Sequence, residues 1–238
     1  MSDPRRAAQE SPLDALPTPD QLTARVVDPG PPPRLLGYDV EGDLARHYGF
    51  AELLLLAGSG DLASPAAARA LELALIFLSP ISVAEAPAHA GLLARLCDVP
   101  AQGRLAIGAL ALAEEAAFVL REHAAWLDWL GAPEAARGPA PEPFLAASED
   151  ERASVARLRS ALEAIPFRVS ALDLEVQPTR TAALLAVLIT SGLPVAFIPV
   201  AWTIARLPAL AAESASAHRL AFHRYPINLP PLDYEEEP

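Results

Sequence analysis

Residues 102–130 read QGRLAIGALALAEEAAFVLREHAAWLDWL, and this run rich in alanine and leucine decides the fold class. Alanine and leucine are strong helix formers. The β-branched and aromatic residues that favour strands are scarce, and aromatic residues make up only 6% of the chain. The run therefore predicts one long helical stretch, and the composition predicts an all-α protein.

Helical patterns continue on both sides of this run. Ser64-Pro65 and Ser148 with Glu151 are typical of helix starts, and Ser191-Gly192 is typical of a helix end. The predicted helices cover residues 66–78, 82–97 with an interruption at Pro87, 148–163, 181–190, and 194–213 with kinks at Pro199 and Pro208. We expect about seven to nine helices around one core, with no strand except a short one within residues 166–178.

Proline marks both ends of the chain. Proline blocks regular helix, so residues 1–36 are expected to form an extended arm or a disordered segment. The helical domain is assigned to residues 37–226, and an acidic, proline-rich tail to residues 227–238. The first residues lack the apolar core of a signal peptide. The uninterrupted apolar runs are shorter than the ~20 residues of a membrane span, so a cytoplasmic location is expected.

Charge and cysteine content exclude several classes of protein. The formal net charge of the 238 residues is −12, whereas nucleic acids and anionic membranes bind clustered lysine and arginine. Cys97 is the single cysteine, so no intrachain disulfide can form. Because Cys97 ends an apolar run, we expect a buried structural thiol.

The familiar motifs of catalytic and metal sites are absent from the sequence. It has no glycine-rich phosphate loop, HExxH, paired CxxC, EF-hand loop or GxSxG segment. The histidines show no i, i+4 pairing that would favour a metal site; they are His47, His89, His123, His218 and His223. We therefore expect neither a metal nor a resident cofactor.

Two stretches together carry a resemblance to a known family. The first contains Gly37-Tyr38, Asp43-Leu44-Ala45, Phe50, Glu52, Leu54-Leu55-Leu56, Gly58 and Leu62. The second contains Gly192-Leu193-Pro194 and Ile204-Ala205-Arg206, followed by Arg224 and Pro226. In order and spacing they resemble the citrate synthase superfamily, especially its short citryl-CoA lyase-like members. The resemblance implies a multi-helical citrate synthase-like fold and a dimer formed through helices such as residues 92–112.

The resemblance also implies that the catalytic residues have been replaced. The family joins an acetyl thioester to a keto acid, which requires a base and two hydrogen-bond donors, provided by an Asp and two His. In this sequence Thr181 occupies the Asp position and Pro143 one His position. Two registers remain open for the other His, one placing Ala106 and one Ala116 there. None of these side chains can act as the required base or as the donor that the histidines supply, so no catalytic residue is expected to be retained.

The arginines that bind carboxylates in the family are better preserved. Arg206 matches closely, whereas Arg152 and Arg224 match more loosely. Arginine pairs bidentately with carboxylates, so this set could still hold a dicarboxylate. The structural alternatives are a core salt bridge for Arg206 and a helix surface for Arg152.

Three functions are compatible with these residues. The favoured one is a catalytically inactive structural or regulatory subunit, in a homodimer or in a heterodimer with a citrate synthase paralogue. The second is an active acyl-CoA carbon–carbon lyase or synthase that uses other groups, with candidates His89, His123, Asp173, Glu175 and Arg206. The third is a non-catalytic sensor that binds CoA, as a thioester or free, or a dicarboxylate such as citrate.

Overall fold

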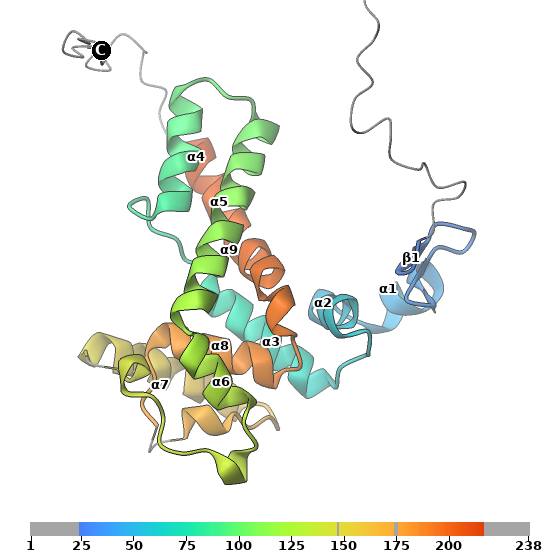
Figure 1. Cartoon of the computed structure of the whole chain (residues 1–238). Coiled ribbons are helices and arrows are strands. Elements are labelled where there is room, and N and C mark those ends of the chain that lie inside the picture. The colour runs from blue at the N-terminus through green and yellow to red at the C-terminus, as the bar shows by residue number, and fades with distance from the viewer. Residues whose placement is uncertain (1–23, 147, 174–175, 217–238) are drawn as a thin grey trace, which may run out of the picture. The chain divides into compact units, whose positions relative to one another are not determined.

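The computed structural model describes residues 24–146, 148–173 and 176–216. These residues fall into two compact units that divide between His47 and Tyr48. The first unit contains the three short strands, and the second contains helices α2 to α9 (Figure 1). The predicted all-α class is therefore confirmed, with one small sheet near the N-terminal side.

The first unit is a three-stranded antiparallel sheet followed by helical turns. Its strands β1 (Val27–Asp28), β2 (Arg34–Leu35) and β3 (Tyr38–Asp39) are ordered β1-β2-β3. Leu36 and Gly37, which join β2 to β3, have φ values of 49° and 87°, as a two-residue hairpin turn requires. The Asp39 side chain accepts hydrogen bonds from the backbone at the start of the π-helix Val40–Leu44, which α1 (Ala45–His47) continues.

The second unit is built from helices and short turns. The helices are α2 (Phe50–Ser59), α3 (Pro65–Leu78), α4 (Ala86–Leu96), α5 (Ala101–Glu122), α6 (Ala124–Gly131), α7 (Glu149–Glu163), α8 (Arg180–Thr190) and α9 (Ile198–Ser216). The 3-10 turns are Glu134–Ala136, Glu142–Phe144, Ser170–Leu172 and Val195–Phe197. The hydroxyls of Ser64, Ser148 and Thr179 accept N-cap hydrogen bonds at α3, α7 and α8.

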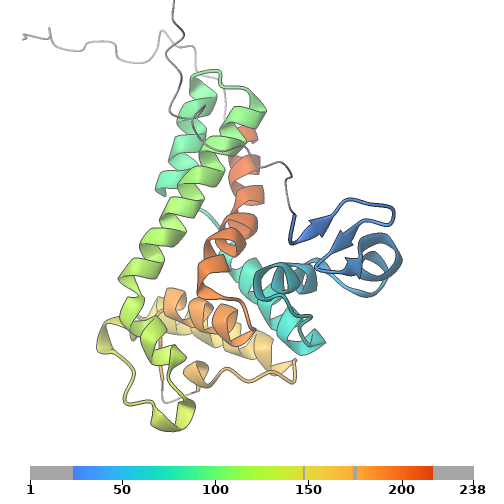
Figure 2. The ribbon, with the colours of Figure 1, turned by 45° about the vertical axis from the view of Figure 1, so that its right-hand side comes forward.

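Helix α8 lies at the centre of the core. Its residues 182–188 are all buried, as expected for a helix that is apolar on every side. It packs against α3 and α7, and Figures 1 and 2 show it beneath the longer helices. Trp126 of α6 is fully buried beside it and donates its indole N–H to the Ala182 carbonyl at 2.9 Å.

Helices α4, α5 and α9 lie side by side as a bundle (Figure 2), and α9 also packs against α3. Glycines allow their close approach to Leu210 of α9. A Cβ atom added at Gly108 of α5 would lie 2.6 Å from Leu210 Cδ2, and one at Gly91 of α4 would lie 3.3 Å away. The bundle can therefore pack closely only because these positions lack side chains.

The structure differs from the predicted helix boundaries in two places. The long stretch 102–130 is divided at His123, whose φ of −101° and ψ of 17° leave the helical region. Pro87 lies in the first turn of α4 instead of interrupting a longer helix, because proline is tolerated where no intrahelical donor is needed. No strand forms within the described part of residues 166–178, where only an isolated bridge joins Pro178 to Leu145.

Two further features differ from the sequence-based picture. The small sheet spans residues 27–39 and so crosses the expected boundary between arm and helical domain at residue 36. The prediction of a buried Cys97 is wrong, because Cys97 is exposed. Cys97 is the C-cap of α4, where the chain leaves the buried face of the helix.

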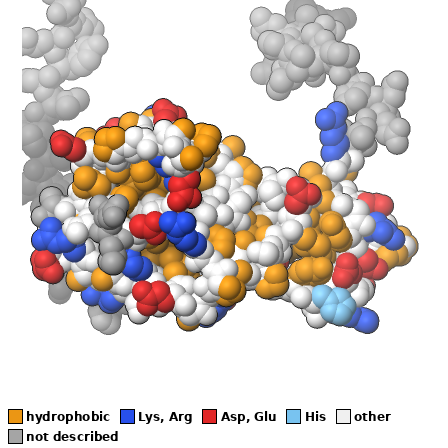
Figure 3. All heavy atoms as spheres, turned by 90° about the horizontal axis from the view of Figure 1, so that it is seen from below, with side chains coloured by type: hydrophobic (Ala, Val, Ile, Leu, Met, Phe, Trp, Pro, Cys, Tyr) orange, Lys and Arg blue, Asp and Glu red, His pale blue; other side chains and the backbone are white. Residues whose placement is uncertain are grey.

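Charges are mixed on the face drawn in Figure 3. Acidic and basic side chains lie interspersed there, with hydrophobic side chains between them. This face therefore carries no extended basic patch of the kind that nucleic acids bind.

Helix α9 has the composition of a membrane span but also packs inside the bundle. With its preceding turn, Val195–Ser216 has a mean hydropathy of 1.6 and is the one helix in the described ranges long and apolar enough to cross a bilayer. Core helices of globular proteins pass the same test. Helix α9 packs along α4 and α5 and carries the buried, ion-paired Arg206, although only 28% of its apolar window is buried within the chain.

Candidate functional site

The candidate site centres on Arg206, whose side chain is only 7% exposed. Its Nη1 donates to the Glu115 carboxylate of α5, and its Nη2 donates to the Glu85 carboxylate at the start of α4. Nη2 also lies 3.2 Å from the Pro80 carbonyl oxygen. Trp202, one turn before Arg206 on α9, donates its indole N–H to Glu115 at 2.8 Å. One buried cation therefore holds two carboxylates from two other helices.

The electrostatics of the cluster keep Glu85 ionised. Burial disfavours the charge of Glu85 and by itself raises its pKa. The Ser82 backbone N–H, 2.6 Å from Oε1, and the guanidinium groups of Arg206 and Arg180 favour the charge and together outweigh burial. The pKa of Glu85 is therefore lowered, as expected for a carboxylate in a formed ion pair.

Arg180 extends this charged cluster to the first turn of α8. Its Nη2 donates to the Phe77 carbonyl at the end of α3, which holds the guanidinium near Glu85. Thr181, which the resemblance predicts to occupy the family's Asp position, is the next residue and is half-buried. Arg206 and Arg180, the residue before Thr181, therefore both act on the charge of Glu85.

The structure brings the segments of Pro143 and Thr181 together. The Thr179 backbone N–H donates to the Phe144 carbonyl at 2.7 Å, which joins the residues next to each position. Pro143 itself is exposed in the turn Glu142–Phe144. The segments that contain residues 143 and 181 are therefore paired in the fold, although they are far apart in the sequence.

Ala106 and Ala116, the two residues predicted for the remaining His position, both lie on α5. Ala106 is exposed on this helix, whereas Ala116 is fully buried in the core. His123, at the end of α5, lies beside the Pro143 segment, with its ring 5.0 Å from the Phe144 ring. Its Nδ1 is 2.8 Å from the Val119 carbonyl oxygen, and because that oxygen only accepts, Nδ1 carries the proton. Nε2 is then the nitrogen of His123 that could act as a base.

Arg152 lies elsewhere, on the exposed side of α7. It pairs with Glu149 at 3.1 Å and borders a hollow of about 250 Å³ that also includes Pro178. The predicted helix-surface position of Arg152 therefore agrees with the structure. Arg224 and Glu175 fall outside the described residues.

Two other candidates lie on the surface. His89 is exposed on α4. Asp173 is exposed and pairs with Arg168 at 2.7 Å. In the described ranges, no group of three His, Cys, Asp or Glu side chains is arranged to hold a metal ion.

Sequence reasoning missed the acidic partners of Arg206. Glu115 is part of the Glu114-Glu115 pair within an otherwise alanine- and leucine-rich helix, and this was the available signal. Glu85 directly precedes α4 and carries no comparable signal. A buried arginine requires counter-charges, and Glu85 and Glu115 provide them for Arg206.

Structural comparison defines the class of fold. Citryl-CoA lyase from Hydrogenobacter thermophilus superposes with a TM-score of 0.60 at 17% identity, covering 91% of this chain and 97% of that chain. ATP citrate lyase from Methanothrix soehngenii, in complex with citrate and coenzyme A, gives a TM-score of 0.63 at 16% identity. That match covers 93% of this chain but only 43% of the larger enzyme.

A second ATP citrate lyase extends the comparison. The enzyme from Methanosaeta concilii, in complex with (3S)-citryl-CoA, gives a TM-score of 0.58 at 16% identity, covering 84% of this chain and 39% of that chain. No family model and no curated protein matches the sequence. The chain therefore has the citrate synthase-like multi-helical fold, in the form found in citryl-CoA lyase, which confirms the predicted resemblance at the level of the fold.

Proposed function

We propose that this chain is a citryl-CoA lyase-like protein without catalytic activity that serves as a structural or regulatory subunit in the cytoplasm. The observation that carries the proposal is the capture of Arg206 by Glu85 and Glu115. The partner is a second copy of the chain or an active citrate synthase paralogue.

The residues at the catalytic positions support loss of activity. Removing a proton from a thioester methyl group requires a base, and the Thr181 hydroxyl has no useful basicity near neutral pH. Pro143 has no hydrogen-bond donor, and neither Ala106 nor Ala116 has a polar side chain. The two predicted His positions therefore provide no side-chain donor to stabilise the negative charge that develops in the transition state.

The environment of Arg206 supports the same conclusion. Both of its terminal nitrogens already donate to the carboxylates of Glu85 and Glu115. A ligand carboxylate would have to displace one of them and then lie beside the other negative charge. Because such close like charges repel, a citrate or oxaloacetate group has no vacant cation at this position.

The outer face of α5 supports a role as a subunit. Ile107, Leu110 and Phe118 follow each other at helical spacing on this face, and Leu110 is 66% exposed. Exposed apolar side chains gathered on one helix face favour a protein–protein contact surface. In α9, moreover, only 28% of the apolar window of Val195–Ser216 is buried within the single chain. Both helices would bury apolar surface in a dimer.

One alternative function rests on His123. If the active site had shifted, Nε2 of His123 could act as a base beside the Pro143 segment, as in an active acyl-CoA lyase or synthase. This alternative predicts activity that is lost in His123→Ala. The sensor alternative predicts thermal stabilisation by coenzyme A or citrate without turnover.

Thiol release tests the proposal directly. The purified chain is incubated with acetyl-CoA and oxaloacetate, and separately with citryl-CoA, beside an active citryl-CoA lyase as the positive control. We expect release at the rate measured without protein. Activity above that rate, abolished by His123→Ala but not by His89→Ala, would replace the proposal with the shifted-site enzyme.

A further inference from the structure

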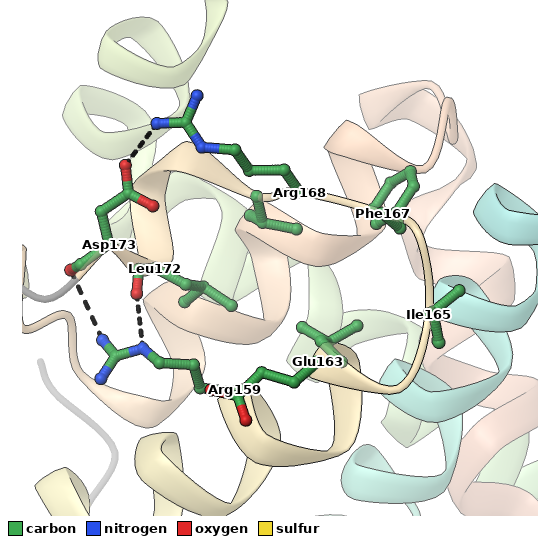
Figure 4. A pocket seen from close by; sticks show the side chains of 9 residues that line it. Arg159, Glu163, Ile165, Phe167, Arg168, Leu172 and Asp173 are labelled. Atoms are coloured by element: carbon green, nitrogen blue, oxygen red, sulfur yellow. Dashed lines mark hydrogen bonds and ion pairs between the residues drawn. The ribbon is translucent and has the colours of Figure 1, made fainter.

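A hollow of about 530 Å³ lies between the end of α7 and residues 165–173 (Figure 4), and none of its lining residues belongs to the Arg206 cluster. Its floor is apolar, because Leu162, Val169 and Leu172 are each at most 6% exposed. The half-buried Phe167 adds an aromatic wall. This volume falls in the range of ~300–1,000 Å³ typical of small-molecule sites.

Arg159 is held at one side of the hollow with donor capacity left over. Its Nε donates to the Leu172 carbonyl at 2.6 Å, and its Nη2 lies 3.4 Å from the Asp173 carbonyl oxygen. Within the described ranges Arg159 has no carboxylate partner, and its Nη1 has no acceptor. The Leu172 and Asp173 carbonyls therefore hold the Arg159 guanidinium in place, and no described carboxylate pairs with it.

Glu163 places an opposite charge on the same side of α7. It lies four residues after Arg159, so both side chains face the hollow, as Figure 4 shows. Glu163 is the last residue of α7, where the helix dipole disfavours an anion, and it forms no ion pair with any described residue. A cation from outside the chain would relieve this unfavourable placement.

The remaining charges at the rim are already paired. Arg168 lies 2.7 Å from Asp173 and 3.4 Å from Glu134. A ligand therefore meets an apolar floor and two charges, Arg159 and Glu163, that have no ion-pair partner among the described residues.

We propose that this hollow binds a free α-amino acid with a bulky apolar side chain. The ligand carboxylate pairs with Nη1 of Arg159, and its ammonium group pairs with Glu163. The apolar side chain packs on Leu162 and Leu172 beside Phe167. This site is independent of the proposed function, because it shares no residue with the Arg206 cluster.

Calorimetric titration of the full chain with matched probes tests this inference. The probes are L-phenylalanine, 3-phenylpropanoate, which lacks the ammonium group, and 2-phenylethylamine, which lacks the carboxylate. We expect L-phenylalanine to bind about ten-fold or more tightly than either analogue, since each analogue loses one charge-assisted contact. No heat from L-phenylalanine at millimolar concentration, or equal affinities for all three probes, would overturn the proposal.

Two variants assign the contacts. Glu163→Gln should weaken L-phenylalanine about ten-fold and leave 3-phenylpropanoate unchanged, because the propanoate makes no contact with Glu163. Arg159→Gln should weaken L-phenylalanine but leave 2-phenylethylamine unchanged. Arg157→Gln, an exposed change on α7 outside the hollow, is the control and should alter no affinity. Equal losses for all probes in Glu163→Gln would contradict the assigned pairing.

Discussion

Replacing Arg206 with methionine tests the buried ion-pair cluster. The change keeps the apolar packing but leaves Glu85 and Glu115 facing each other without their cation. Breaking a buried pair from one side costs about 3–5 kcal/mol. Because Glu85 is 37% exposed and Glu115 22%, solvent screens part of this loss, and we expect the lower end of the range.

Thermal unfolding followed by circular dichroism measures the effect. At about 2–4 °C per kcal/mol for a chain of this size, a loss of about 3 kcal/mol lowers Tm by about 6–12 °C. Arg152→Met is the matched control: its exposed pair with Glu149 contributes about 0–1 kcal/mol, so Tm should change little. A Tm of Arg206→Met within about 2 °C of the unmodified chain would refute the reasoning.

The same variant has a defined pH dependence. In the unmodified chain the pKa of Glu85 is lowered by folding, so ionised Glu85 stabilises the fold above its unfolded value near 4.5. This contribution is lost as pH falls through the lower folded pKa. Without Arg206 the folded pKa of Glu85 rises, so the variant loses less on acidification. The Tm difference between the two proteins should therefore narrow as the pH falls below about 4.5.

Three further changes test packing and assembly. Gly108→Ala forces a methyl group toward Leu210 and should destabilise the bundle by about 1–3 kcal/mol in urea unfolding; an unchanged midpoint would show that the helices can separate at little cost. Trp126→Phe leaves the Ala182 carbonyl without its donor and opens space in the core. We expect the free energy of unfolding in urea to fall by about 2–4 kcal/mol, and a fall below about 1 kcal/mol would contradict this. Leu110→Arg should shift the mass measured by light scattering from that of a dimer to that of a monomer, while the monomer stays folded. If the unmodified chain is itself a monomer, the proposed dimer interface on α5 is refuted.

The helix starts and the fold class could be predicted because their signals are local. Ser64 and Ser148 cap α3 and α7 as their sequence context indicates, since a cap depends on residues within one turn. The break at His123 and the exposure of Cys97 could not be read from periodicity. Both depend on where a helix ends, and that is decided by packing against other elements.

The candidate site, like the fold, could be predicted from the sequence only in part. The resemblance identified Arg206 and the segments of Pro143 and Thr181, and the structure pairs those two segments. The partners Glu85 and Glu115 were missed, because they lie 121 and 91 residues from Arg206. No local spacing relates residues so far apart.

By itself, the sequence determined an all-helical chain and its caps, and the resemblance implied that the catalytic residues are replaced. These properties follow from helix propensity, from short-range hydrogen bonds and from the chemistry of single side chains. Only the tertiary structure decided that Arg206 is neutralised by Glu85 and Glu115, and that Arg159 and Glu163 line a hollow without an ion pair to any described residue. The physical reason is that a charge acts through the few ångströms around it, and the packing of the helices determines which groups lie within that distance.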